Sequence, residues 1–125
     1  MIDYDLSDPD GIIVVTGTGL WTIDEVTAHY GRLRAIIAER RSAGMPIRVL
    51  SDVRQGQRQS PEIEAAILQL ITETYLPGDR IAILTGSEVD KAHVRSVLGQ
   101  ADVAAFQSRL PAEMWLMTDD LEPPR

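Results

Sequence analysis

Short apolar runs and longer stretches with an apolar residue every third or fourth position follow one another along the chain. Short runs that alternate or are continuously apolar are typical of strands, whereas a spacing of three and four is typical of helices. The pattern predicts five strands, at residues 2–6, 12–15, 47–52, 81–84 and 103–106. It predicts four helices, at residues 23–43, 61–75, 88–99 and from 111 to about 116.

The helix ends carry their own signals. Thr22 is followed three residues later by Glu25, which is a capping-box pattern, and Ser60 stands before Pro61 as an N-cap. Gly44 ends the first helix. The residues expected to face the core are Ile23, Val26, Tyr30, Leu33 and Ile37 in the first helix, Ile63, Ile67, Leu68, Leu70 and Ile71 in the second, Val94, Val97 and Leu98 in the third, and Trp115 in the last.

This order of elements predicts an α/β fold. A strand–helix–strand connection is nearly always a right-handed parallel crossover, so the second, third and fourth strands are expected to be adjacent and parallel. The first strand turns back through residues 8–11 and is expected to pair antiparallel at an edge. The predicted class is α/β, with a mixed, mostly parallel sheet of four or five strands and about four helices. The 125 residues fit one domain over residues 1–117 and a polar tail over 118–125.

Composition narrows the function classes. The net charge of -7 argues against nucleic-acid binding, and the lack of cysteine excludes disulfides and thiolate metal sites. No apolar run reaches the roughly 20 residues of a membrane span. The acidic start lacks the basic region of a signal peptide. A soluble cytoplasmic protein with no cofactor and no metal is expected.

The candidate site is the stretch 47–61, where a strand runs through a polar loop into a helix start. Such loops at the carboxyl ends of strands are where open α/β sheets bind ligands and partners. Arg54 and Arg58 lie in this loop, and residues 32–58 hold seven arginines in all. They are either a solvated face or a basic patch for an acidic partner. Asp52 is expected to be ionised and paired; either Arg54 folds back onto it, or Arg54 and Arg58 form a functional pair.

No catalytic motif stands out. Gly17-x-Gly19 precedes a helix as in dinucleotide-binding folds, but Thr22 occupies the third glycine position, so the glycines are expected to ease a sharp turn. His29 and His93 have no partner at metal-ligand spacing. The chain is therefore not expected to be an enzyme.

A set of motifs, each weak alone, extends over residues 1–117. It comprises the Gly19 to Thr22 helix start, Val49-Leu50-Ser51-Asp52-Val53-Arg54, Asp79-Arg80-Ile81-Ala82-Ile83-Leu84 before a Thr/Ser loop, Phe106, and Ala112-x-x-Trp115-Leu116. With this spacing the chain resembles the SpoIIAA-like family of small bacterial STAS-type proteins (sulphate transporter and anti-sigma-factor antagonist). The resemblance implies one antiparallel edge strand, helices largely on one side of the sheet, and no established catalytic reaction.

The resemblance also raises the question of a phosphorylation switch. Anti-sigma-factor antagonists carry Asp-Ser-Ser/Thr-Gly at this strand–helix loop, and a kinase phosphorylates the serine. Here Asp52 matches the aspartate, but Val53-Arg54-Gln55 replaces the residues that follow. Ser60 lies eight residues on and is needed as a helix cap, so the switch is not expected here.

Two functions are compatible with the sequence. The first is a regulatory or protein-interaction domain, with a protein partner or a homodimer at the edge where the carboxyl-terminal loops meet; its candidate residues are Leu20, Trp21, Asp52, Arg54, Arg58, Ser60, Thr85 and Gly86. The alternative binds a small ligand, a lipid or an organic anion, between apolar walls from Leu20, Trp21, Leu68 and Leu76, with Arg54 or Arg58 as counter-charge. A flat surface would favour the first function, and an enclosed apolar pocket the second.

Overall fold

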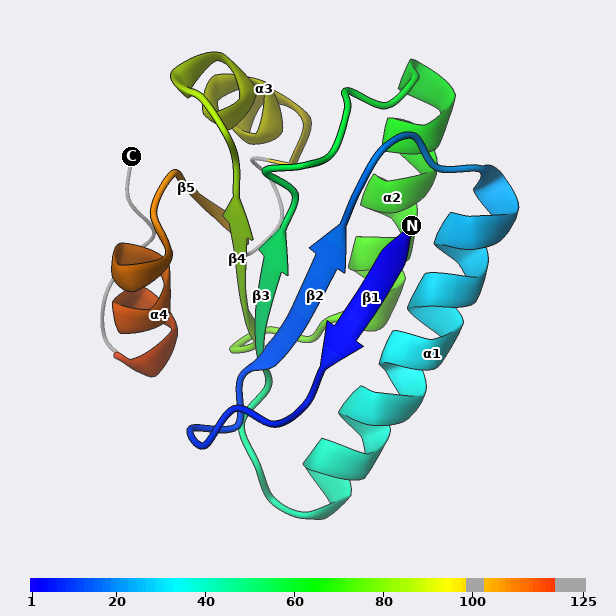
Figure 1. The fold of residues 1–125 in the computed structure, drawn as a ribbon. Coiled ribbons are helices and arrows are strands. Elements are labelled where there is room, and N and C mark those ends of the chain that lie inside the picture. Colours follow the sequence, from blue (N-terminus) through cyan, green and yellow to red (C-terminus); the bar gives the residue numbers. More distant parts are fainter. Residues whose placement is uncertain (99–102, 119–125) are drawn as a thin grey trace.

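In the computed structural model, which describes residues 1–98 and 103–118, five strands form one sheet (Figure 1). They are β1 (Ile2–Asp5), β2 (Ile13–Gly17), β3 (Arg48–Asp52), β4 (Arg80–Leu84) and β5 (Val103–Phe106), and they lie side by side in chain order. β1 pairs antiparallel with β2, and the other neighbours are parallel. The predicted mixed sheet with an antiparallel N-terminal strand at its edge is confirmed.

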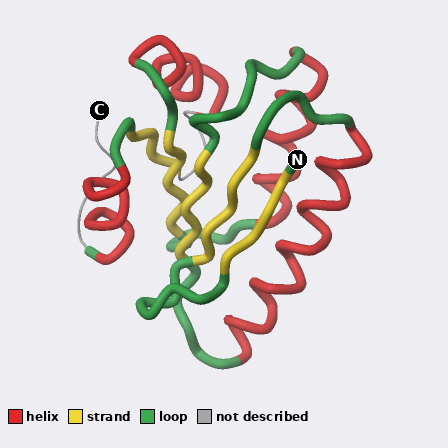
Figure 2. Tube along the Cα trace, in the orientation of Figure 1, coloured by secondary structure: helices red, strands yellow, loops and turns green. Residues whose placement is uncertain are grey.

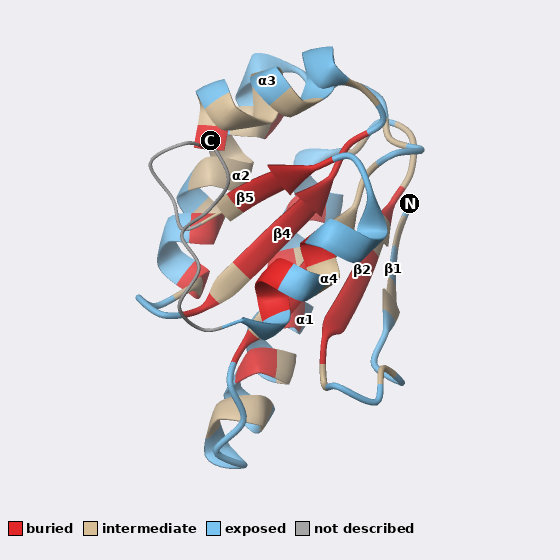
Figure 3. Cartoon of the chain, turned by 90° about the vertical axis from the view of Figure 1, so that its left-hand side faces the viewer, coloured by how far each residue is buried: buried red, intermediate tan, exposed pale blue. Residues whose placement is uncertain are grey.

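The helices form two unequal layers. Those of the described residues are α1 (Ile23–Ser42), α2 (Pro61–Thr74), α3 (Glu88–Leu98) and α4 (Arg109–Met117). α1, α2 and α3 lie over one face of the sheet, and α4 lies alone on the opposite face (Figures 2 and 3). Successive strand residues point to opposite faces, so Ile81 and Ile83 pack with α1 to α3 whereas Ala82 and Leu84 pack with α4.

Several element ends differ from the prediction for local reasons. β1 stops at Asp5, because the Asp5 carboxylate accepts the Ser7 amide at 2.9 Å and begins the turn. α4 begins at Arg109 rather than Pro111, since a proline third in a helix removes an amide that has no intrahelical acceptor. The predicted end of the third helix at residue 99 and the tail beyond residue 118 lie outside the described residues.

The predicted core is largely correct, with one clear error. Val26, Tyr30, Leu33 and Ile37 of α1 are buried, but Ile23 is 46% exposed. Ile23 is the first helical residue, where the helix end leaves its side chain uncovered. In α2, Ile63 and Ile71 are buried and Ile67, Leu68 and Leu70 are half-buried.

The α4 face packs tightly because its central residues are small. Ala82, Ala104 and Ala112 are at most 2% exposed, which allows α4 to approach the sheet closely. Trp115 closes this layer: it is 6% exposed, its ring centroid lies 5.8 Å from that of Phe106, and the Arg80 guanidinium lies 5.0 Å from its ring. The predicted burial of Trp115 is confirmed.

We expect Trp115→Ala to lower the free energy of unfolding by about 3–5 kcal/mol, since it leaves a cavity between α4 and β5. Met114 lies on the same helix and is 61% exposed, so Met114→Ala is the matched control and should cost less than about 0.5 kcal/mol. Denaturant unfolding measures both, and similar losses for the two variants would contradict the packing described here.

Candidate functional site

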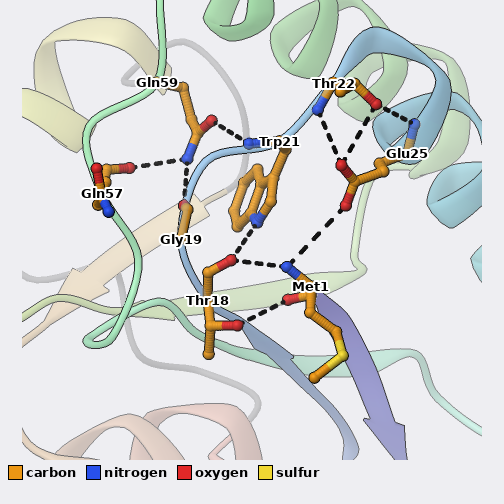
Figure 4. Close-up of polar contacts among 8 residues, drawn as sticks. All are labelled: Met1, Thr18, Gly19, Trp21, Thr22, Glu25, Gln57 and Gln59. Carbon is orange, nitrogen blue, oxygen red and sulfur yellow. Dashed lines mark hydrogen bonds and ion pairs between the residues drawn. The ribbon is translucent and has the colours of Figure 1, made fainter.

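The loop between β2 and α1 is tied to the loop after β3 by a network of hydrogen bonds (Figure 4). The Gln59 side chain accepts a hydrogen bond from the Trp21 amide at 2.9 Å and donates one to the Gly19 carbonyl at 3.0 Å. The backbones add a second link, because the Gln57 amide donates to the Gly19 carbonyl at 3.1 Å. The two loops therefore form one rigid edge at the carboxyl ends of β2 and β3.

Gly17, the last residue of β2, and Gly19, in the loop that follows, have different structural roles. Gly19 has a φ of 70°, which a side chain would strain, so its predicted role in a sharp turn is confirmed. Gly17 serves Trp21: any Cβ at Gly17 would collide with the indole ring. The indole nitrogen donates to the Thr18 carbonyl at 3.1 Å, which fixes the ring across the end of β2.

Asp52 and Arg54 pair with each other at the end of β3. The guanidinium donates to both carboxylate oxygens, at 2.9 and 2.8 Å, and the Arg54 amide donates at 3.1 Å. These hydrogen bonds, the side-chain ones foremost, lower the pKa of the Asp52 carboxyl. The prediction that Asp52 is ionised and paired is confirmed, and Arg54 is the residue that folds back onto it.

A pocket of about 200 Å³ lies between the sheet and the layer of α1, α2 and α3. Its walls are mainly apolar and come from β2, β4 and all three helices; among them are Val15, Ile67, Ile71, Ile83, Val94 and Val97. Exposed residues at the carboxyl edge of the sheet, including Gln57, Arg58 and Gly86, also line it, so the pocket opens there.

An ion pair and a hydrogen bond connect α3 to the rest of the chain beside this opening. Arg58 lies 3.2 Å from Asp90, and Nε2 of His93 lies 2.7 Å from Oε1 of Glu64 on α2. All four residues line the pocket. Because the two contacts join α3 to α2 and to the loop before it, they hold the outer wall in place.

The inner part of the pocket is lined by aromatic side chains from α1 and α2. His29 and Tyr30 come from α1, and Tyr75 follows directly after α2. Tyr4 supports His29 from β1: its hydroxyl contacts Nδ1 of His29 and donates to the His29 carbonyl at 2.9 Å. Burial lowers the pKa of His29 to about 4, so the imidazole is neutral at pH 7.

The structure brings only part of the predicted site together. Trp21, Arg58, Thr85 and Gly86 line the pocket, and Thr85 is buried with its hydroxyl 3.3 Å from the Phe106 carbonyl.

The predicted walls at Leu20, Leu68 and Leu76 are wrong: Leu20 and Leu76 are 60% and 56% exposed, and none of the three belongs to the lining. Asp52 and Arg54 pair outside the lining, and Ser60 caps α2 by accepting the Ile63 amide. A binding role for any of these residues stays a prediction.

The sequence interpretation missed Gln59 and the inner aromatic residues. Gln59 stands in a polar loop with nothing to distinguish it from Gln55 or Gln57. Tyr30 was predicted as a core residue, and the helical spacing that places it inward carries no signal for a pocket.

With this geometry in view, the structure can be compared with solved ones. It is similar to the crystal structure of an uncharacterised protein of the DUF3478 family from Shewanella loihica PV-4, which has a SpoIIAA-like fold. The TM-score is 0.67 at 18% sequence identity, over 93% of this chain and 92% of that chain. This chain has a SpoIIAA-like fold. The predicted resemblance is confirmed at the level of the fold, and function has to be argued from the site.

No protein-family model and no curated protein sequence matches the chain. Within the described residues, no helix is both long and apolar enough to cross a membrane. The same part of the chain contains no group of three or more His, Cys, Asp or Glu side chains placed to hold a metal ion.

We expect Gln59→Ala to lower the free energy of unfolding by about 1 kcal/mol, because the Trp21 amide and the Gly19 carbonyl lose their shared partner. Gln55→Ala is the matched control, since the Gln55 side chain is exposed and the bond to Gly19 uses its backbone carbonyl. Denaturant unfolding and hydrogen exchange of the Trp21 amide measure the effect. Equal stability and equal exchange in the two variants would show that the Gln59 bonds do not hold the loops.

The ion pair of Asp52 should contribute to stability in a pH-dependent way. Its folded-state pKa lies below the unfolded value of about 3.9, so the contribution is present above that value and is lost as the pH falls through the folded pKa. Asp52→Asn should therefore be less stable than the natural chain by up to about 1 kcal/mol at pH 7, and the difference should fade at acidic pH. Urea unfolding between pH 2 and 7 tests this, with Asp10→Asn on the exposed turn as control. If the difference in free energy of unfolding persists at the lowest pH, it does not come from the ionised Asp52 carboxylate.

Proposed function

We propose that this protein is a non-catalytic domain that binds a small, mainly apolar molecule in the pocket between the sheet and α1 to α3. The observation that carries the proposal is the pocket itself, about 200 Å³ of space with mainly apolar walls. Protein interiors are normally close-packed, and apolar space left unfilled lowers stability. An occupant that fills the space would restore those contacts.

The size of the pocket sets the size of the ligand. An apolar cavity of about 150 Å³ accepts benzene, whereas pockets for drug-sized molecules begin near 300 Å³. A pocket of about 200 Å³ therefore suits a single ring or a short chain of roughly eight to ten non-hydrogen atoms. A whole membrane lipid exceeds this size, so the pocket favours a smaller occupant than a complete lipid molecule.

The charges of the lining argue against an organic anion as the occupant. Arg58 is the arginine of the lining, and it is paired with Asp90. Glu64 adds a second carboxylate, paired with His93. An anion would meet no unpaired cation among these residues and would lose its hydration, so a neutral ligand is favoured.

The regulatory or protein-interaction function, which came first from the sequence, has weaker support than the pocket. The observation in its favour is the exposure of two apolar side chains: Leu20, in the loop before α1, is 60% exposed, and Val89, on α3, is 70% exposed. Two separate side chains do not amount to a contiguous apolar patch. A protein partner or homodimer at this edge stays a prediction, which sedimentation velocity can test.

We expect Val94→Phe to fill the pocket and abolish ligand binding. Val94 lies on α3 and lines the pocket, whereas Val89 on the same helix is 70% exposed, so Val89→Phe is the matched control. Neutral one-ring molecules such as isopropylbenzene and acetophenone should raise the unfolding temperature of the natural chain and of Val89→Phe, because a ligand that binds only the folded state stabilises it. Val94→Phe should show no such rise. If none of these molecules raises the unfolding temperature of the natural chain, the proposal is overturned.

A further inference from the structure

Two tyrosine hydroxyls in the pocket have no partner in the described part of the chain. Tyr30 is 8% exposed, Tyr75 is half-buried, and both line the pocket. Neither hydroxyl makes a hydrogen bond to residues 1–98 or 103–118. Thr74 Oγ1 and Trp115 Nε1 are the fully buried side-chain polar atoms without a partner in the described residues. The two tyrosine hydroxyls are not among them, so they keep some accessible surface, and both residues line the pocket.

Tyr75 lies at the end of α2 that is away from the opening, and Tyr30, about 10 Å along α1 from its start, is near enough to raise the pKa of Tyr75. Glu64 stands beside the opening near the start of α2, and Tyr75 follows the last residue of the same helix. The distance between them along the helix axis is about 16 Å. A molecule that enters past Arg58 and Glu64 therefore reaches the tyrosines with its inner end.

The charge near the two hydroxyls is negative rather than positive because, in addition to burial, the Asp79 carboxylate, which pairs with Arg41, raises the pKa of Tyr75. Burial raises the pKa of Tyr30, and burial and then the neighbouring Tyr30 raise the pKa of Tyr75. Burial also raises the pKa of Tyr4 to about 12 and lowers that of His29 to about 4. The inner end thus offers hydroxyl donors and no cation among the groups that line it.

We propose that the occupant of the pocket carries a neutral hydrogen-bond acceptor, such as a carbonyl oxygen, which Tyr30 and Tyr75 hold at the inner end. This inference rests on the proposed function and names the class of ligand for the same pocket. An occupant that covers a hydroxyl without offering it a partner removes its hydration at a cost in free energy, whereas an acceptor on the ligand supplies the partner. A site built to hydrogen-bond its ligand discriminates strongly against an analogue that lacks the polar atom. A carboxylate is excluded by the same site, because its charge would be buried without a counter-ion.

Two molecules of equal size test the inference. Isopropylbenzene carries a methyl group in the place of the carbonyl oxygen of acetophenone, so it lacks the hydrogen-bond acceptor. The double variant Tyr30→Phe/Tyr75→Phe keeps both rings and removes both hydroxyls. We expect it to bind acetophenone about tenfold more weakly than the natural chain does, a change of the size of one lost hydrogen bond. Its dissociation constant for isopropylbenzene should be unchanged or lower.

Tyr4→Phe is the matched control. The Tyr4 hydroxyl is engaged with His29 and Tyr4 does not belong to the lining, so its removal should leave the preference for acetophenone intact. Benzoate serves as the charged analogue and should bind at least tenfold more weakly than acetophenone at pH 7. Circular dichroism and unfolding of each variant show that it is folded.

The outcomes separate this inference from the proposed function. If both neutral molecules bind the natural chain and the double variant with the same ratio of dissociation constants, the pocket is a ligand site and the assignment to Tyr30 and Tyr75 is overturned. Benzoate that binds more tightly than acetophenone also overturns it. If neither neutral molecule binds the natural chain, the proposed function itself fails, and the inference fails with it.

Discussion

The structure depends on the unequal packing of the two faces of its sheet. On one face, alanines at positions 82, 104 and 112 let α4 lie close to the strands, and Trp115 seals the layer. On the other face, branched residues such as Ile81 and Ile83 support three helices. The two faces form separate buried clusters, and the larger one lies on the face of α1 to α3. The pocket lies within this larger cluster, so unfilled apolar space there lowers stability unless an occupant fills it.

The topology decides where this pocket opens. β2, β3 and β4 are parallel, so the loops that follow them leave the sheet at a common edge. Gln59 joins the first two loops. The Arg58–Asp90 ion pair and the Glu64–His93 hydrogen bond connect the second loop and α2 to α3. The polar residues of this edge thus hold the opening in shape, and the apolar residues behind it form the space. This division explains why few of the charged side chains near the opening are left to bind a charged ligand.

The fold could be predicted from the sequence because it follows from local rules. The period of the apolar residues gave the order of strands and helices, and the handedness of strand–helix–strand connections gave the parallel pairing. Trp115 was placed correctly by its size and its position in a short helix. Ile23 was placed wrongly because periodicity assigns a face but does not reveal where a helix end is left uncovered.

The pocket could not be predicted in the same way, since it is a property of packing between elements distant in sequence. Trp21, Arg58 and Thr85 were found because a strand end has a recognisable position. Tyr30 and Tyr75 carry the same apolar signal whether they fill a core or face a space within it. The predicted walls at Leu20 and Leu76 failed because both side chains turn outward at loop positions where no period exists to orient them.

The loop after β3 is where the sequence differs from the anti-sigma-factor antagonists that it resembles. By that resemblance Asp52 matches the motif aspartate, and Arg54 holds its carboxylate with two side-chain hydrogen bonds and one from the backbone. Val53 occupies the position of the first serine and lines the pocket with an apolar side chain. Ser60, the nearby hydroxyl, accepts the Ile63 amide at the start of α2. Asp52, Arg54 and Ser60 thus each have a structural partner, whereas the hydroxyls of Tyr30 and Tyr75, two residues that line the pocket, have none within the described residues. The hydrogen-bonding capacity of these two hydroxyls is therefore open to a molecule inside the pocket.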